Sequence, residues 1–251
     1  MFDQYSDIFD RRGREYHQAM VAQPLARAEE FRHIIDIAAL KPGLRVFDLP
    51  SGGGYLKHFF NCLVDITEVE TSKAFHELAC QDRSVTHLLC EDISQVPAPD
   101  HSVDRVLSLS GLHHIEQRAP FYQEAWRLLK PNGLLCIGDV AKGSNADRFL
   151  NDFVDQNGSQ GHVGLFLNNE DIQLIESTGF KVNSSVHQRY HWRFSDIAQM
   201  VWFVKKLFGI DKCNDSKVLQ GIEEHLGFDT FNNKILMEWS LQYIQAKRSA
   251  D

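Results

Sequence analysis

Three acidic residues end or follow short apolar segments of the chain. Asp48 ends the segment LRVFD, Glu70 comes 22 residues later at the end of a second segment, and Asp92 follows a third segment that ends at Cys90. In a doubly wound sheet, a carboxylate at the end of the second strand can accept hydrogen bonds from ribose hydroxyls. Asp92 could accept a hydrogen bond from an adenine amino group while Ile93 packs on the ring. Solvated loop carboxylates and helix caps are simpler alternatives for each residue, but their coincidence at three strand ends favours a ligand site.

A glycine-rich turn, Pro50-Ser51-Gly52-Gly53-Gly54, follows Asp48 directly. Glycine has no Cβ, so the backbone of such a turn can approach a ligand closely. A turn that only connects a strand to a helix is the alternative.

The elements that must position these residues alternate along the first half of the chain. Apolar runs predict strands at 44–49, 63–69, 85–90, 103–110 and 134–140, and periodic segments predict helices at 24–40, 55–61, 72–79 and 120–129. Strands that alternate with helices pair in parallel with right-handed crossovers. Further along, we expect a helix at 170–178 capped by Asn169, a strand at 180–190, a helix at 195–208 capped by Ser195, a helix at 216–226 and a long final strand at 234–247.

Composition and charge exclude several classes of protein. The 251 residues carry a net charge of −8 and 43% hydrophobic residues, which is typical of a globular domain and argues against a nucleic-acid partner. The chain contains no apolar stretch long enough to cross a membrane, and the polar N-terminal segment lacks the features of a secretory signal, so we expect a cytoplasmic protein. Five cysteines without a CxxC motif predict neither disulfides nor a zinc site, and we expect them to be small buried residues.

Several segments together resemble the class I S-adenosylmethionine-dependent methyltransferases, in particular the small-molecule branch with an Asp-x-Gly-x-Gly-x-Gly loop. The similar segments are VFDLPSGGGYL, TEVETS, CEDI, APDHSVDRVLSLSGLHHI and EAWRLLKPNGLLCIGDV. The resemblance is clear over residues 40–140 and continues more weakly through ESTGF to the C-terminus. It implies a Rossmann-like α/β fold: a doubly wound seven-stranded sheet whose last strand is antiparallel, with a helical insertion between the last two strands. We expect a single domain with an N-terminal helical segment (1–40) and a cofactor-binding core (41–140). Because the last two predicted strands need only a short hairpin between them, we expect the residues that separate them to form a helical cap (195–233).

The resemblance also assigns cofactor contacts to residues of this chain. Asp48 would orient the loop and the methionine amino group, and Gly52 and Gly54 would let the methionine chain pass. Glu70, beside Thr71, would hold the ribose hydroxyls. The remaining contacts are Asp92 and Ile93 for adenine, the Ser108 carbonyl for the amino group, and Pro50, which replaces the family's first loop glycine and removes an N–H donor.

Two other functions fit parts of the same pattern. A nicotinamide-dependent oxidoreductase would need a third glycine where this chain has Lys57, and the LKPNG turn favours the methyltransferase. A non-catalytic relative that binds the cofactor or a partner would share every motif. Methyl transfer to an added acceptor distinguishes an enzyme from such a relative.

Candidates for a catalytic base and for substrate binding lie outside the predicted cofactor site. His113 and His114 follow the fourth predicted strand, so either could serve as a general base, although capping and packing are alternative roles. The resemblance also implies that peripheral segments of the chain shape the pocket of a small-molecule acceptor. The candidates there are Tyr5, Tyr16, Trp192, Trp202 and Phe203, with core packing as the alternative. The other histidines, His162 among them, have no spacing typical of metal ligands, so we expect no metal. We expect Arg11, Arg12 and Arg14 to form a solvated face.

Overall fold

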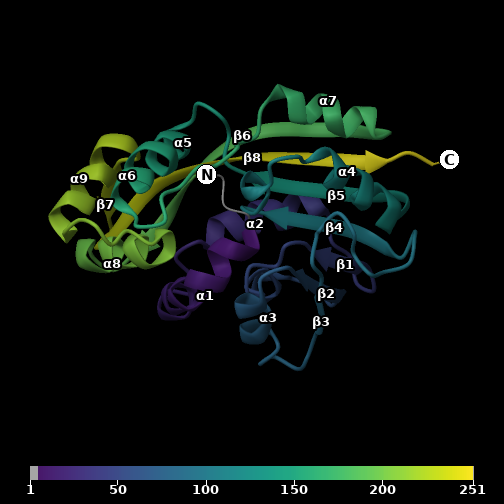
Figure 1. Cartoon of the computed structure of the whole chain (residues 1–251), viewed down its shortest axis with the longest axis horizontal. Coiled ribbons are helices and arrows are strands. Elements are labelled where there is room, and N and C mark those ends of the chain that lie inside the picture. Colours follow the sequence, from purple (N-terminus) through teal and green to yellow (C-terminus); the bar gives the residue numbers. More distant parts are fainter. Residues whose placement is uncertain (1–4, 251) are drawn as a thin grey trace.

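The computed structural model describes residues 5–250 and contains one mixed β-sheet (Figure 1). Residues 1–4, which begin the predicted segment 1–40, and residue 251 lie outside the described part. The eight strands among the described residues are β1 Arg45–Asp48, β2 Asp65–Glu70, β3 Thr86–Leu89, β4 Val103–Leu109, β5 Leu129–Asp139, β6 Phe180–Phe194, β7 Phe228–Phe231 and β8 Lys234–Arg248.

The topology of the sheet confirms the predicted fold. The strand order is β3-β2-β1-β4-β5-β8-β6, and β7 pairs with β8 outside this path. The first five strands pair in parallel, whereas β8 is antiparallel to both β5 and β6. The short strand β7, which the sequence did not predict, forms a hairpin with β8. Because β1 and β4 are adjacent and their neighbours follow in opposite directions, the switch point of the sheet lies between them.

Helices cover both faces of the sheet. They are α1 Tyr5–Ala22, α2 Ala28–Ala38, α3 Lys73–Ala79, α4 Ala119–Leu128, α5 Asn145–Arg148, α6 Asp155–Asn157, α7 Asn169–Ser177, α8 Ile197–Phe208 and α9 Asp215–His225. On β5, Cys136 packs in the core that contains α2, while its neighbours Leu135 and Ile137 pack in the core that contains α4 and α7. This alternation places one core on each face. None of these helices, in the part of the chain described, has the length and apolar character needed to cross a bilayer.

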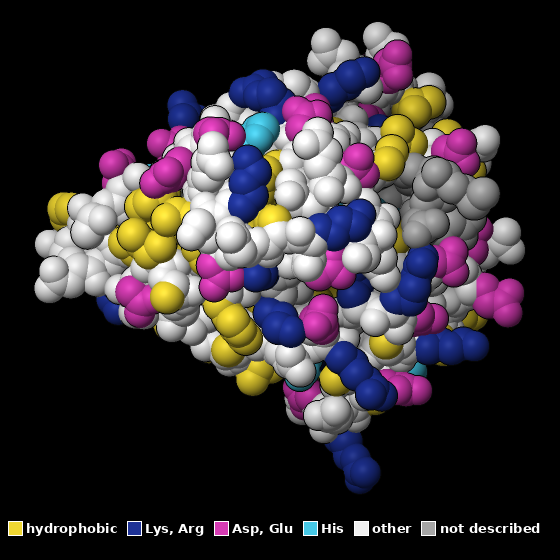
Figure 2. Space-filling view, turned by 60° about the vertical axis from the view of Figure 1, so that its left-hand side comes forward, with side chains coloured by type: hydrophobic (Ala, Val, Ile, Leu, Met, Phe, Trp, Pro, Cys, Tyr) yellow, Lys and Arg dark blue, Asp and Glu magenta, His cyan; other side chains and the backbone are white. Residues whose placement is uncertain are grey.

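Strands β6 and β8 are 15 residues long and extend beyond the rest of the sheet. Their extension carries a lobe of α5, α6, α8, α9 and β7, on the left in Figure 1. The lobe contains the two helices predicted within 195–233, and α1 packs against α8. On the face shown in Figure 2, basic and acidic side chains are interspersed.

Four local predictions need correction. The helix expected from residue 24 begins at Ala28, after a turn in which Leu25 is exposed. The helix expected at 55–61 is only a 3₁₀ helix, Leu56–Phe59, because Phe60 already has an extended backbone. The helix caps are Asn168 and Asp196 rather than their neighbours Asn169 and Ser195, and in each case the cap side chain accepts a backbone N–H of the first turn.

Candidate functional site

Glu70 is the most densely hydrogen-bonded of the predicted site residues. At the end of β2 it is 1% exposed, and its carboxylate accepts the N–H groups of Gly52 (2.8 Å), Thr71 (2.8 Å) and Ser72 (3.0 Å). The Tyr5 hydroxyl of α1 donates to the same carboxylate at 3.2 Å. Burial raises the pKa of Glu70 to about 7, and these four donors oppose that rise.

Asp48 is the second buried carboxylate of this site. It is 2% exposed at the end of β1, and its Oδ2 atom has no hydrogen-bond partner among the described residues. Burial, and then the nearby charges of Glu68 and Glu70, raise its pKa well above the ordinary value. A buried acceptor without a donor is costly, so Asp48 offers an oxygen that a ligand's donor could satisfy.

The two predicted loop glycines have different neighbours. Gly52 has a φ of +59°, and a Cβ there would lie 3.8 Å from the Tyr5 hydroxyl, so its backbone faces the Glu70 site. Gly54 has a φ of +79°, and its Cβ would lie 2.4 Å from Glu68 Oε2. Lys57 holds that Glu68 carboxylate at 3.0 Å. Gly54 therefore makes room for a buried ion pair, a role that the sequence did not indicate.

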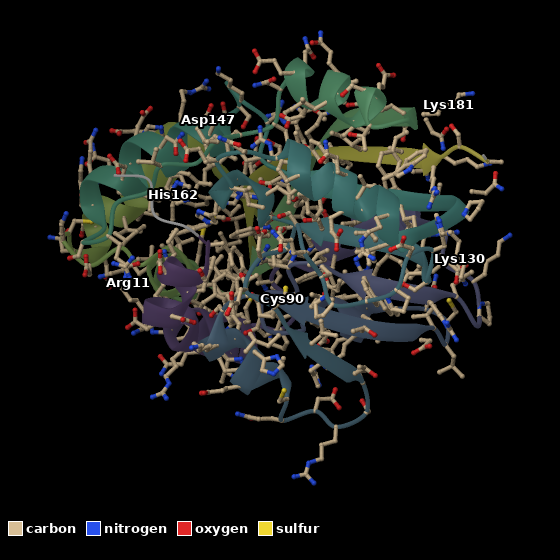
Figure 3. All side chains as sticks on the ribbon, turned by 45° about the vertical axis from the view of Figure 1, so that its right-hand side comes forward. Arg11, Cys90, Lys130, Asp147, His162 and Lys181 are labelled. Atoms are coloured by element: carbon tan, nitrogen blue, oxygen red, sulfur yellow. The ribbon has the colours of Figure 1, made fainter. Side chains whose placement is uncertain are left out.

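A cavity of about 870 Å³ opens at the carboxyl ends of the strands, where Thr71, the residue after Glu70, forms part of its wall. Of the predicted cofactor residues, Pro50, Thr71, Asp92 and Ile93 line it. The other lining residues come from the segments that follow β3 and β4 and from α1: Tyr5, Ser6, Cys90, Glu91, Ser94, Gln95, Pro97, Gly111, His114, Ile115, Glu116, Gln117, Pro120 and Phe121. The other predicted cofactor residues, Asp48, Gly52, Gly54, Glu70 and Ser108, are not part of this lining, and Ser108 is fully buried in β4. Figure 3 labels Cys90, which marks this cavity, and His162, which marks a second one.

The second cavity, of about 50 Å³, lies between α1, α8 and the ends of β6 and β8. Its walls are largely aromatic and basic: Phe9, Arg12, Tyr16, Arg27, Ser110, His113, His114, Val140, Leu150, His162, Trp192, Leu207, Phe208 and Trp239. His114 lines both cavities and so connects them. Arg12 is only 9% exposed, which corrects the prediction that it belongs to a solvated face. Burial lowers the pKa of Arg12 to about 10, and its Nε has no partner among the described residues.

Three buried histidines meet at the second cavity. The ring centroids of His113 and His114 are 4.1 Å apart, and His162 lies 5.5 Å and 5.4 Å from them. Burial lowers the pKa of His114 and His162 well below the ordinary value, so both rings are neutral at pH 7. His113 Nδ1 lies 2.6 Å from Asp139 Oδ1. Burial would raise the Asp139 pKa, but the contact with His113 and the Val140 N–H hold it below the ordinary value.

The predicted acceptor residues separate into two groups. Tyr5, Tyr16 and Trp192 line one of the two cavities, and the Trp192 indole also donates to Glu30 at 2.9 Å. Trp202 is 39% exposed and Phe203 is fully buried, and neither lines either cavity. Helix α8 reaches the second cavity through Leu207 and Phe208 instead.

Sequence reasoning missed three of the residues at these cavities. Arg12 and His162 carried no motif, and they join the site because of how the chain folds around α1 and after β5. Asp139 ends β5 inside the matching segment EAWRLLKPNGLLCIGDV, but nothing in the sequence indicated a role for it, and it reaches the site through its contact with His113. The cysteines are free and Cys90 and Cys136 are buried as expected, but Cys80 is exposed, and Cys62 and Cys213 are partly exposed.

Residues 47–137 match the family model described as a methyltransferase domain. Among curated relatives, the malonyl-[acyl-carrier protein] O-methyltransferase of Serratia marcescens is 25% identical over 135 residues, which cover 53% of this chain and 52% of that protein. The arsenite methyltransferase of Halobacterium salinarum is 29% identical over 119 residues, 42% of this chain and 29% of that protein. The chain therefore spans about half, or less, of the length of these relatives.

Solved structures share the fold at lower identity. A putative methyltransferase of Bacillus halodurans has a TM-score of 0.63 and 19% identity, with 88% of this chain and 99% of that chain covered. A Thermotoga maritima protein, described as an S-adenosylmethionine-dependent methyltransferase and possible histamine N-methyltransferase, has a TM-score of 0.64 and 18% identity. The match covers 98% of this chain and 100% of that chain.

Proposed function

We propose that this chain, which belongs to the class I S-adenosylmethionine-dependent methyltransferases, binds S-adenosylmethionine at the carboxyl ends of β1, β2 and β3 and transfers its methyl group to a small-molecule acceptor. The observation that carries the proposal is Glu70. Three backbone N–H groups hold this buried carboxylate at the end of β2, where nucleoside-binding sheets place the acceptor for ribose hydroxyls.

The residues present fit this cofactor. The cavity of about 870 Å³ is within the usual range for small-molecule sites, and Asp92 and Ile93 line it on the side expected for adenine. The unpartnered Asp48 Oδ2 supplies an acceptor for the methionine amino group. The cofactor supplies an electrophilic methyl group on a sulfonium, and the chain's contribution is to hold donor and acceptor in line.

Tyr5 must move for the ribose to bind in this way. Its hydroxyl donates to the Glu70 carboxylate at 3.2 Å, in the position of a ribose hydroxyl, and its side chain is 8% exposed. We infer that α1 covers the site and that cofactor binding displaces the Tyr5 hydroxyl from Glu70.

We place the small-molecule acceptor at the second cavity, which at about 50 Å³ is below the usual range for such sites and must widen to admit it. This cavity is narrow and mostly aromatic, and it adjoins the cofactor cavity at His114, which lines both. Asp139 accepts the Nδ1 proton of His113 at 2.6 Å, so His113 Nε2 carries the lone pair that a general base needs. An acceptor that reaches this cavity would lose its proton to His113 as its nucleophilic atom attacks the methyl carbon.

The two alternative functions, a nicotinamide-dependent oxidoreductase and a non-catalytic relative, can be compared with this structure. A dinucleotide needs the N-terminus of a regular helix for its pyrophosphate, but here the loop leads into a four-residue 3₁₀ helix and Lys57 pairs with Glu68. This favours S-adenosylmethionine over a nicotinamide cofactor. A non-catalytic relative would bind the cofactor and leave every acceptor unmodified.

A calorimetric titration followed by an acceptor screen tests the proposal. We expect S-adenosylmethionine to bind with one site per chain and NAD to give no heat. We then expect label from methyl-labelled cofactor to reach at least one small molecule, and His113→Gln to slow that transfer by roughly 10²–10⁴-fold with cofactor affinity unchanged. Binding heat from NAD but none from S-adenosylmethionine would reject the proposal. Binding of S-adenosylmethionine without methyl transfer to any acceptor would favour the non-catalytic relative.

A further inference from the structure

His113, His114 and His162 each offer a ligand nitrogen, and these three nitrogens lie within 4.8 Å of one another. All three side chains are buried, with exposed fractions of 6%, 6% and 9%. The first two belong to the 3₁₀ helix Leu112–His114 after β4, and His162 comes from the loop after α6. We propose that the three form a binding site for one divalent transition metal ion of the zinc class, at the junction of the two cavities. Metal binding does not require the proposed methyl transfer, but a metal ion on His113 Nε2 would occupy the lone pair that the metal-free histidine would use as a base.

The hydrogen bonds behind two of the rings orient them as metal ligands. Asp139 accepts from His113 Nδ1 at 2.6 Å, and Asn151 Oδ1 lies 3.2 Å from His162 Nδ1. Gly164 sets the orientation of the Asn151 amide, because its N–H donates to Oδ1 at 2.7 Å and its carbonyl accepts from Nδ2 at 3.0 Å. In each ring Nδ1 therefore carries the proton and Nε2 keeps its lone pair. Oxygen acceptors behind histidine ligands are the usual arrangement of a metal centre.

His114 supplies the second, independent observation. Its Nδ1 atom is buried and has no hydrogen-bond partner among the described residues. A buried imidazole nitrogen without a partner needs an explanation, and a bound metal ion would provide one. The ring also touches both cavities, so a metal held here would lie at the junction between them.

Ligand chemistry limits the metal. Three imidazoles suit Zn²⁺, Co²⁺, Ni²⁺ or Cu²⁺ and suit the oxygen-seeking Mg²⁺ and Ca²⁺ poorly. A four-coordinate zinc with Zn–N bonds of about 2.0–2.1 Å needs its ligand nitrogens roughly 3.3 Å apart, so the rings would draw together slightly on binding. The fourth position would face the second cavity, open to solvent or to an acceptor.

The nearby charges limit the fourth ligand. Arg12 lines the same cavity with an unpartnered Nε, and its positive charge opposes a bare dication. Asp139 provides one compensating negative charge, and Arg27 is already neutralised by Glu30. We therefore expect the metal to carry an anionic fourth ligand, such as hydroxide or an ionised acceptor atom, that also pairs with Arg12.

Metal binding can be measured without cofactor or activity. Tag-free protein would be stripped with a chelator, dialysed and titrated with Zn²⁺ alone by calorimetry, and separately with Co²⁺ alone by visible absorption. We expect one equivalent of Zn²⁺ and the d–d bands of a four- or five-coordinate cobalt site. His162→Ala and His162→Gln should weaken Zn²⁺ binding at least tenfold, and Asp139→Asn by roughly 10–100-fold.

His187→Ala is the matched control, because His187 is exposed on β6 and far from the cluster in the sequence. It should leave Zn²⁺ affinity unchanged. Thermal melts would show that each variant is folded, and titration with S-adenosylmethionine would show that the cofactor cavity is intact. The proposal fails if the wild type binds no Zn²⁺, or if the folded His162 variants bind it as tightly as the His187 variant does. Because no cofactor is present in the metal titrations, neither failure bears on the proposed methyl transfer.

Discussion

The raised pKa of Glu70 predicts that cofactor affinity depends on pH. Burial brings this pKa to about 7. Ribose hydroxyls donate to the carboxylate, so the cofactor binds the ionised form preferentially and its affinity should rise as pH rises through 7. If only the ionised form binds, the fraction available is about one half at pH 7 and about one eleventh at pH 6, and affinity should fall about tenfold from pH 8 to pH 6. That factor corresponds to about 1.4 kcal/mol.

The assay is calorimetric titration with S-adenosylmethionine across this pH range, on wild type and on Glu70→Gln. The glutamine retains the shape of the side chain but cannot ionise, so its profile should be flat. Its affinity at pH 8 should be lower by roughly 1–3 kcal/mol, because the hydrogen bonds to ribose lose their charge. Asp48→Asn is the control, since Asp48 is the other buried carboxylate at the site and its pKa is also raised.

Two results would refute this reasoning. A flat profile for the wild type would mean that Glu70 is ionised throughout the range or does not contact the cofactor. A slope that survives in Glu70→Gln and disappears in Asp48→Asn would assign the titration to Asp48. Thermal melts at pH 6 and pH 8 would separate both results from a change in folding.

Three further predictions concern Tyr5, Gly54 and Phe208. Tyr5→Phe should bind S-adenosylmethionine up to about tenfold more tightly, because it removes a hydrogen bond to a charged group that competes with the ribose; weaker binding would mean that the hydroxyl contacts the cofactor directly. Gly54→Ala should lower the free energy of unfolding in urea by more than Gly143→Ala. Both positions have a φ near +80°, but a Cβ at Gly143 meets nothing within 4 Å, so equal losses would exclude the clash at Gly54. Phe208→Ala should raise the acceptor KM whereas Trp202→Ala should not, since of the two residues only Phe208 lines the second cavity. The reverse result would indicate that the acceptor binds on the outer side of α8.

The central sheet could be predicted because its signal is local. Each buried strand is a short apolar run, and the alternation with helices determines parallel pairing. The antiparallel last strand came from the resemblance rather than from any residue pattern. The helix predicted at 55–61 was wrong although Leu56, Phe59 and Phe60 have helical spacing. The chain must reach β2 at Asp65, and the backbone of Phe60 is already extended.

The second cavity could not be predicted, because its members are distant in the sequence. His162 meets His113 only through the path of residues 141–168, which includes the π-helical turn Phe149–Val154 that carries Asn151. That path has no periodic pattern. Arg12 lies in a run of arginines that reads as a solvated face, and only the packing of α1 on α8 buries it. The contact of Tyr5 with Glu70 likewise depends on where α1 lies.

A crystal structure of the protein with S-adenosylhomocysteine tests the central claim most directly. The account predicts that both ribose hydroxyls lie within hydrogen-bonding distance of Glu70, that adenine lies beside Asp92 and Ile93, and that the Tyr5 hydroxyl has left the Glu70 carboxylate. Adenosine bound elsewhere, with the contact between Tyr5 and Glu70 intact, would contradict it.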